Sequence, residues 1–91
     1  MRKNDCRLGR FGGEEFLILL PDTEEQEAEI LADRLRTAIR ETKLENVPAV
    51  TVSIGLSQHQ ASLANLERWI EITDGALYLA KAKGRDRVQI A

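Results

Sequence analysis

The sequence contains little cysteine, histidine or aromatic residue, and each scarcity excludes a class of protein. Its single cysteine, Cys6, excludes an internal disulfide framework and a zinc site built from several cysteines. The single histidine, His59, lies among Gln, Ser and Ala without a partner at ligand spacing, so it is interpreted as an ordinary loop residue. Four aromatic residues are few for a platform that stacks single-stranded nucleic acid, and no nucleic-acid partner is expected.

Long hydrophobic runs are also missing. No apolar stretch is long enough to cross a membrane, and the basic start MRKNDCRLGR lacks the apolar region of a signal peptide. The composition is typical of one small globular domain, with 43% hydrophobic and 31% charged residues in a chain of 91. A domain of this size folds with little stability to spare.

The charge is segregated along the chain. The formal net charge is only −2, yet residues 1–10 and residues 81–87 each carry a net charge of +3, and the middle is acidic. If the fold brings the two basic ends together, they form an anion site in an acidic protein. The alternative is that both are solvated chain ends.

Residue patterning predicts the element order β-β-α-β-α-β. The pair Gly12-Gly13 separates two short extended runs and predicts a hairpin over residues 6–20. Alternating apolar residues predict a strand over 50–56, and a short final strand is expected over 87–90. Gly55 within the former strand indicates a bulge or the close approach of another backbone.

Apolar stripes at helical spacing predict two helices, over residues 23–42 and 63–83. Asp22 and Glu25 have the spacing of a capping box for the first helix, and Gly84 fits the cap after the second. The predicted stripes are Ala28, Leu31, Leu35, Ala38 and Ile39 in the first helix, and Leu66, Trp69, Ile70, Thr73, Ala76, Leu77 and Ala80 in the second. Gly75, inside the second helix, is interpreted as allowing close packing.

The hairpin tip suggests a chemistry. Gly12 and Gly13 would let a phosphate or ribose approach the backbone, and Glu14 and Glu15 follow at once. Carboxylates beside a phosphate require a divalent metal between them, and such oxygen ligands suit Mg²⁺. A plain turn with two solvated glutamates is the alternative that these residues leave open.

Four segments together resemble the GGDEF domains of the diguanylate cyclase family. They are RFGGEEF at 10–16, FLILLP at 16–21, VTVSIG at 50–55 and DGALYLAKAKGRD at 74–86. The resemblance covers nearly the whole chain. It implies an α+β fold of the nucleotidyl-cyclase (ferredoxin-like) type, an antiparallel sheet covered by helices, with the family's N-terminal strand and helices missing from these 91 residues.

The resemblance also implies an enzyme that joins two GTP molecules into cyclic di-GMP and releases two pyrophosphates, in bacterial second-messenger signalling. It places Gly12 and Gly13 beneath the substrate and makes Glu14 a Mg²⁺ or Mn²⁺ ligand that helps deprotonate the attacking hydroxyl, with Glu15 in support. Lys81 and Arg85, spaced i and i+4, are expected to share one helix face and match residues that hold the terminal phosphates. A basic helix end that satisfies the dipole is the alternative. Leu77, Tyr78 and Ala80 match core or boundary positions.

The implied partners are GTP, a second GGDEF domain that completes a homodimer, and cyclic di-GMP as an inhibitor. Arg2 and Asp5 spell the family's inhibitory R-x-x-D motif, although Asp5 lies one residue farther from Gly12 than usual, which a bulge could absorb. A basic strand start is the alternative. The implied location is cytoplasmic, in a parent protein that a segment outside this sequence can anchor to the inner membrane. Asp86 stands where the family has Asn, which we interpret as a minor change.

The missing segment carries a metal-binding Asp and guanine-reading residues in the family, and its strand is central in the family sheet. We therefore expect no cyclase activity from this chain alone. Three hypotheses remain: the catalytic domain of a cyclase represented by a fragment, a non-catalytic module that binds GTP or cyclic di-GMP, and a truncated reading frame without independent function.

Overall fold

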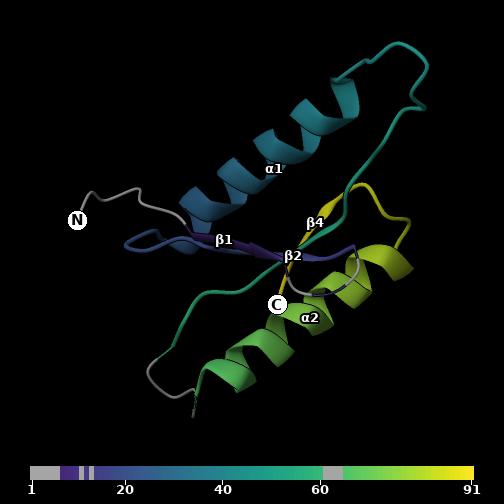
Figure 1. Ribbon diagram of the computed structural model, residues 1–91. Helices are drawn as coiled ribbons and strands as arrows, with labels where there is room; N and C mark the ends of the chain where they lie inside the picture. The colour runs from purple at the N-terminus through teal and green to yellow at the C-terminus, as the bar shows by residue number, and fades with distance from the viewer. Residues whose placement is uncertain (1–6, 11, 13, 61–64) are drawn as a thin grey trace.

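The computed structural model describes residues 7–10, 12, 14–60 and 65–91. The predicted element order is confirmed (Figure 1). The elements are β1 (Arg7–Arg10), β2 (Phe16–Leu19), α1 (Glu25–Glu41), β3 (Ile54–Leu56), α2 (Leu66–Ala82) and β4 (Val88–Ile90). No helix in this described part of the chain is long and apolar enough to cross a membrane.

The strands form two separate pairs. β1 and β2 make an antiparallel hairpin in which Arg10 lies opposite Phe16, whereas β3 and β4 are parallel, with Ile54 opposite Val88. The α+β class holds, but the expectation of one antiparallel sheet is corrected for the second pair. The reason is the connection: α2 carries the chain back to the start of β3, so β4 runs in the same direction.

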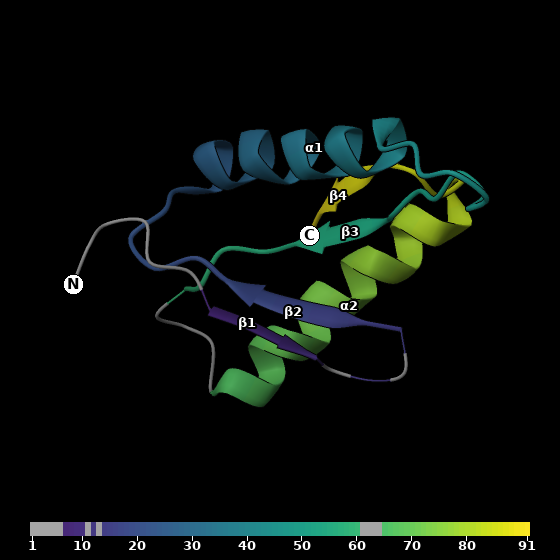
Figure 2. The same ribbon diagram turned by 45° about the horizontal axis from the view of Figure 1, so that its top comes forward.

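The two strand pairs differ in their surroundings. β3 and β4 pack against both helices, with α2 making the larger contact. By contrast, no Cα atom of β1 or β2 lies within 8 Å of a Cα atom in the other described elements. Figure 2 shows the hairpin as a layer of its own, below α1 and, in this view, in front of α2. Within the described residues, each strand therefore has one edge without a β partner.

α1 begins later than its sequence pattern suggested, and its start is not a capping box. The N-cap is Glu24, whose side chain makes no capping hydrogen bond. Asp22 instead adopts a left-handed backbone with φ of 53°, and the Thr23 hydroxyl donates to the carbonyl of Pro21 at 2.9 Å. The expected capping box of Asp22 and Glu25 was wrong, because Asp22 belongs to the turn after Pro21 and the N-cap position is occupied by Glu24.

Both ends of α2 are capped by specific hydrogen bonds. The Asn65 side chain accepts from the backbone N–H of Arg68 at 2.9 Å. At the C-terminal end, Gly84 has φ of 123°, its N–H donates to the carbonyl of Lys81, and the Arg85 N–H donates to the carbonyl of Ala80. These two bonds form a Schellman motif, so the predicted glycine cap is confirmed. The predicted start at residues 63–64 lies outside the described residues.

β3 is shorter than the strand expected over 50–56, because only Ile54–Leu56 has a partner in β4. Position 55 has no space for a side chain. A Cβ atom there would lie 2.5 Å from the Thr73 carbonyl oxygen and 2.8 Å from the Cα of Leu77. The predicted close approach of another backbone is confirmed, and that backbone belongs to α2.

The core is thin. Among the described residues, the buried hydrophobic ones are Ala28, Ala76 and Ala80, each from a predicted stripe. Leu31, Leu35 and Leu66 were expected in those stripes but are 41–59% exposed. Tyr78, matched to a core or boundary position, is also exposed. Much of each stripe stays exposed because, among the described elements, each helix contacts only the short β3–β4 pair.

Two glycine substitutions test this packing. Gly55→Ala is expected to lower the free energy of unfolding by about 1–3 kcal/mol, because its Cβ would overlap the α2 backbone. Gly75→Ala is the matched control: nothing lies within 4 Å of a Cβ there, so the close-packing interpretation of Gly75 was wrong. Alanine should raise stability at that position by about 0.5–1 kcal/mol. Urea unfolding followed by circular dichroism measures both; equal effects of the two changes would contradict the packing described.

Candidate functional site

The hairpin tip connects β1 to β2 through the glycine pair. Gly12 has φ of 137°, a conformation that L side chains rarely adopt, and its carbonyl accepts a hydrogen bond from the Arg10 Nε–H at 3.3 Å. Gly13 lies outside the described residues. Glu14 is exposed and Glu15 is half-buried. The turn thus holds two consecutive carboxylates at the start of β2.

The hairpin tip meets the last turn of α2. The Lys81 ammonium lies 3.8 Å from the Glu15 carboxylate, and both side chains are about one-third exposed. The structure therefore brings together one predicted site residue from the hairpin, Glu15, and one from the basic C-terminal segment, Lys81. This contact joins Glu15 and Lys81, which lie 66 positions apart, although the strands of the hairpin do not pack against α2.

Lys83 is directed elsewhere, since its ammonium donates to the side-chain oxygen of Gln89 at 2.9 Å. Arg85 was expected on the same helix face as Lys81. The two residues do not share a helix face, because α2 ends at Ala82 and Arg85 follows in a left-handed backbone with φ of 63°. Its side chain is exposed, one residue beyond the Gly84 cap.

Asp86, interpreted from the sequence as a minor variation, is a point of attachment between distant elements. Its carboxylate accepts a hydrogen bond from Arg36 at 2.8 Å and lies 3.5 Å from Arg40, both on α1. Its own N–H donates to the Ser53 hydroxyl. Sequence reasoning missed this cluster because Arg36 and Asp86 lie 50 residues apart and neither belongs to a local pattern.

The Arg36 guanidinium, through its hydrogen bond, holds the pKa of the Asp86 carboxyl below its usual range, and Arg40 adds to this. The pKa of Arg36 is raised by its hydrogen bonds to Asp33 and Asp86. Because the lowered pKa belongs to the folded state, the stabilisation is present at neutral pH and is lost on acidification.

We therefore expect the parent chain to lose stability as the pH falls from about 5 to below about 4, in part through protonation of Asp86. Asp86→Asn cannot titrate and should show a shallower dependence on pH over that range. Urea unfolding at a series of pH values checks this, with Asp74→Asn, an exposed position on α2, as the control. Parallel pH curves for Asp86→Asn and the parent would refute the contribution.

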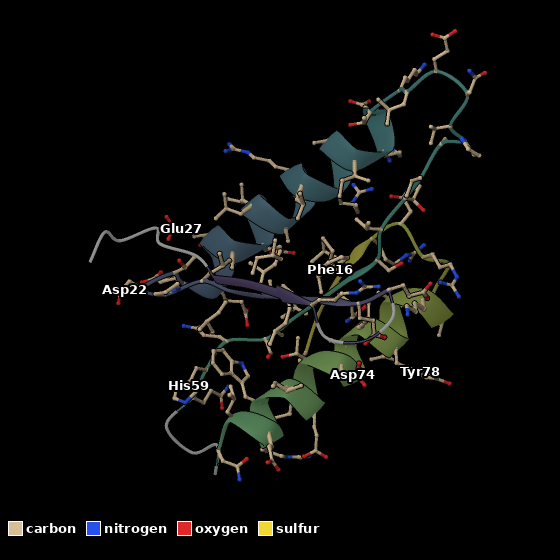
Figure 3. The ribbon with its side chains drawn as sticks, in the orientation of Figure 1. Phe16, Asp22, Glu27, His59, Asp74 and Tyr78 are labelled. Atoms are coloured by element: carbon tan, nitrogen blue, oxygen red, sulfur yellow. The ribbon has the colours of Figure 1, made fainter. Side chains whose placement is uncertain are left out.

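Figure 3 shows Asp74 and Tyr78 on α2, and His59 on the chain before that helix; Tyr78 is 72% exposed. His59 packs edge-on against Trp69, with ring centroids 5.0 Å apart, which agrees with an ordinary structural role. Phe16, beside the carboxylates, is exposed as well.

The proposed inhibitory residues Arg2 and Asp5 lie outside the described residues. Within the described part of the chain, no three or more His, Cys, Asp or Glu side chains gather in a way that could hold a metal ion. Glu14 and Glu15 thus supply two adjacent carboxylates. This donor set fits Mg²⁺, which is commonly bound by one or two carboxylates while substrate phosphates and water complete its shell.

Comparison with known proteins first defines the fold. The active GGEEF domain of a diguanylate cyclase from Vibrio cholerae superposes with a TM-score of 0.85 at 32% identity, covering 96% of this chain and 56% of that one. Diguanylate cyclase SiaD from Pseudomonas aeruginosa, solved in complex with its activator SiaC, gives 0.82 at 35% identity over 94% of this chain and 34% of SiaD. The architecture is that of a GGDEF domain.

The sequence comparison then assigns the family. The model of the family "Diguanylate cyclase, GGDEF domain" matches residues 1–87, so this chain belongs to the GGDEF family. It is similar to diguanylate cyclase DgcM of Escherichia coli K12, with 39% identity over 90 residues, and to DosC of the same strain, with 38% over 84 residues. It spans 22% of DgcM and 18% of DosC, so it corresponds to a small part of each relative.

Proposed function

We propose that this chain is part of the catalytic domain of a diguanylate cyclase, which condenses two GTP molecules into cyclic di-GMP with release of two pyrophosphates. One observation carries the proposal: the Glu15 carboxylate at the hairpin tip and the Lys81 ammonium in the last turn of α2 lie 3.8 Å apart. Carboxylates for a metal and cations for phosphates would therefore face one substrate.

The residues divide the work by their chemistry. Gly12 and Gly13, without side chains, allow the nucleotide to lie against the hairpin backbone. Lys81 and Arg85 bind the terminal phosphates with charge-assisted hydrogen bonds. Since Lys81 contacts Glu15 in this structure, we expect the ammonium to exchange that carboxylate for a phosphate oxygen when GTP binds.

Glu14 and Glu15 would hold Mg²⁺ or Mn²⁺, with Glu14 as the principal ligand. The metal, when bound, neutralises phosphate charge. Glu14 also helps to take the proton from the attacking 3′-hydroxyl. In each step the 3′-oxygen of one GTP forms a bond to the α-phosphorus of the other, and the bond from that phosphorus to the pyrophosphate oxygen breaks.

Each chain would present one GTP, so catalysis requires a second GGDEF domain in a homodimer. This alignment of two nucleotides supplies most of the catalysis through positioning. Cyclic di-GMP would act as an inhibitor through Arg2 and Asp5. We place the reaction in the cytoplasm. A segment outside these residues would anchor the parent protein where it is bound to the inner membrane.

A module that binds GTP or cyclic di-GMP without turnover is the second candidate. It is favoured by one observation, that the described residues bring only two adjacent carboxylates to the hairpin tip and no third metal-binding side chain. Such a module would keep the contacts to phosphate and lose the chemistry.

A chimera separates these functions. The 90-residue segment of DgcM that matches this chain is replaced by the chain, giving the protein called here the DgcM chimera. The cyclase proposal predicts that purified chimera converts GTP into cyclic di-GMP, detected by chromatography, at a rate within about tenfold of DgcM. A folded chimera that binds GTP and forms no product would contradict the cyclase proposal and favour the binding module.

A further inference from the structure

The turn between α2 and β4 has an uncommon backbone. Gly84, Arg85 and Asp86 follow one another with φ of 123°, 63° and 45°. The left-handed region suits glycine but is unfavourable for arginine and aspartate. Two consecutive residues of that kind persist only where surrounding contacts hold them. Arg85, which we assign to phosphate binding, lies between the glycine cap and Asp86.

The contacts that hold this turn come mainly from α1. Arg36 donates to the Asp86 carboxylate at 2.8 Å and to its carbonyl at 3.4 Å, so one guanidinium grips both the side chain and the backbone. The Arg36 side chain is only 14% exposed. Asp33, one helical turn earlier, orients it through a bond of 2.9 Å to Nε.

Other groups face the same aspartate. Arg40 lies 3.5 Å from the second carboxylate oxygen, and the Ser53 hydroxyl accepts the Asp86 N–H at 3.2 Å. Asp86 is therefore held by α1 on one side and by the residue preceding β3 on the other. Its backbone orientation fixes the direction of the peptide bond to Arg85, and thus where the Arg85 side chain leaves the chain.

We propose that Arg36 is a positioning residue that, through Asp86, holds Arg85 in place to bind a phosphate of GTP. The proposal rests on the proposed function for the role of Arg85. Arg36 itself does not touch the nucleotide. It acts from α1 through its hydrogen bonds to Asp86, which precede Arg85 in this series of contacts. The competing explanation is a structural tie that joins α1 to the turn and affects stability alone.

The first measurement needs no nucleotide. In the 91-residue chain, amide hydrogen exchange followed by NMR reports whether the Arg85 and Asp86 N–H groups stay bonded to Ala80 and Ser53. Arg36→Met should speed their exchange at least about tenfold relative to amides in the middle of α2. Arg36→Lys keeps the charge but loses the planar fork, and should give a smaller increase.

Arg68→Met, at an exposed position on α2, is the matched control and should leave the turn amides unchanged. If Arg36→Met prevents folding, Arg36→Lys and Asp86→Asn are used for the same comparison. Exchange of the turn amides that is no faster in the folded variants than in the parent overturns the proposal.

The second measurement tests the action on Arg85 by a double-mutant cycle in the DgcM chimera. Arg36→Met should raise KM for GTP about three- to tenfold with kcat nearly unchanged. Arg85→Ala should raise KM about ten- to a hundredfold. Combined with Arg85→Ala, Arg36→Met should add nothing, because the residue it positions is gone.

The outcomes separate the two proposals. A normal KM in Arg36→Met, or an increase that persists in the Arg85→Ala background, contradicts the positioning role and leaves the proposed function standing. A normal KM in Arg85→Ala removes the phosphate role of Arg85 and this inference with it. A chimera that binds GTP without making product refutes the cyclase proposal, while GTP affinity then replaces KM in the cycle.

Discussion

Glu14→Ala in the DgcM chimera is expected to lower the turnover number at least about a hundredfold. Glu14 is the exposed carboxylate at the tip of the hairpin, next to the glutamate that contacts Lys81. Its proposed roles are ligation of the divalent ion and help in removing the proton of the attacking hydroxyl. Both gain importance as charge develops in the transition state, so kcat should fall more than KM rises.

Two sets of controls accompany this variant. Glu29→Ala removes an exposed glutamate in the second turn of α1 and should leave turnover within about twofold, since surface substitutions away from a site have small effects. Arg2→Ala and Asp5→Ala, at the proposed inhibitory motif, should reduce turnover far less than Glu14→Ala. Steady-state kinetics with GTP and Mg²⁺ gives all four values. Near-normal turnover of Glu14→Ala would refute its metal role.

The second large effect concerns the 91 residues alone, which we expect to form no cyclic di-GMP from GTP and Mg²⁺. The chain covers 56% of the solved Vibrio cholerae GGEEF domain. In the part that the structure describes, its strands remain in two separate pairs and only two adjacent carboxylates stand at the hairpin tip. Groups that position the same transition state act together, so lacking several of them costs many orders of magnitude in rate.

Chromatographic analysis of reactions with the purified chain tests this expectation, with the DgcM chimera as the positive control. Steady product formation by the chain alone would show that these residues assemble a sufficient site, and would contradict the expectation.

The sequence allowed the fold class and the element order to be predicted because the local signals agreed with the tertiary structure. Gly12 provides a hairpin turn that needs a positive φ, and Gly84 provides a helix cap with the bonds of a Schellman motif. Gly55 was expected to admit a neighbouring backbone, and α2 lies there. In each case a short-range steric requirement favours glycine at one position, and the sequence has glycine there.

Long-range arrangement was harder to predict. The parallel pairing of β3 with β4 depends on how α2 returns the chain, which no local pattern encodes. The spacing of Lys81 and Arg85 suggested one helix face, but the Gly84 cap ends the helix between them. The attachment of Asp86 to Arg36 joins residues 50 positions apart, and a charged residue at either position looks like ordinary surface.

The central claim is that the hairpin tip and the basic end of α2 form one phosphate-binding site, and GTP affinity tests it most directly. Calorimetry on the DgcM chimera, with a GTP analogue whose α- and β-phosphates are joined by a methylene group, measures binding without turnover. Lys81→Ala and Arg85→Ala should each weaken binding about ten- to a hundredfold, because each removes a charged hydrogen bond to phosphate. Lys83→Ala, which loses only a bond to Gln89, should bind like the parent. If all three variants bind the analogue as the parent does, the basic end of α2 is a solvated helix terminus and the account is wrong.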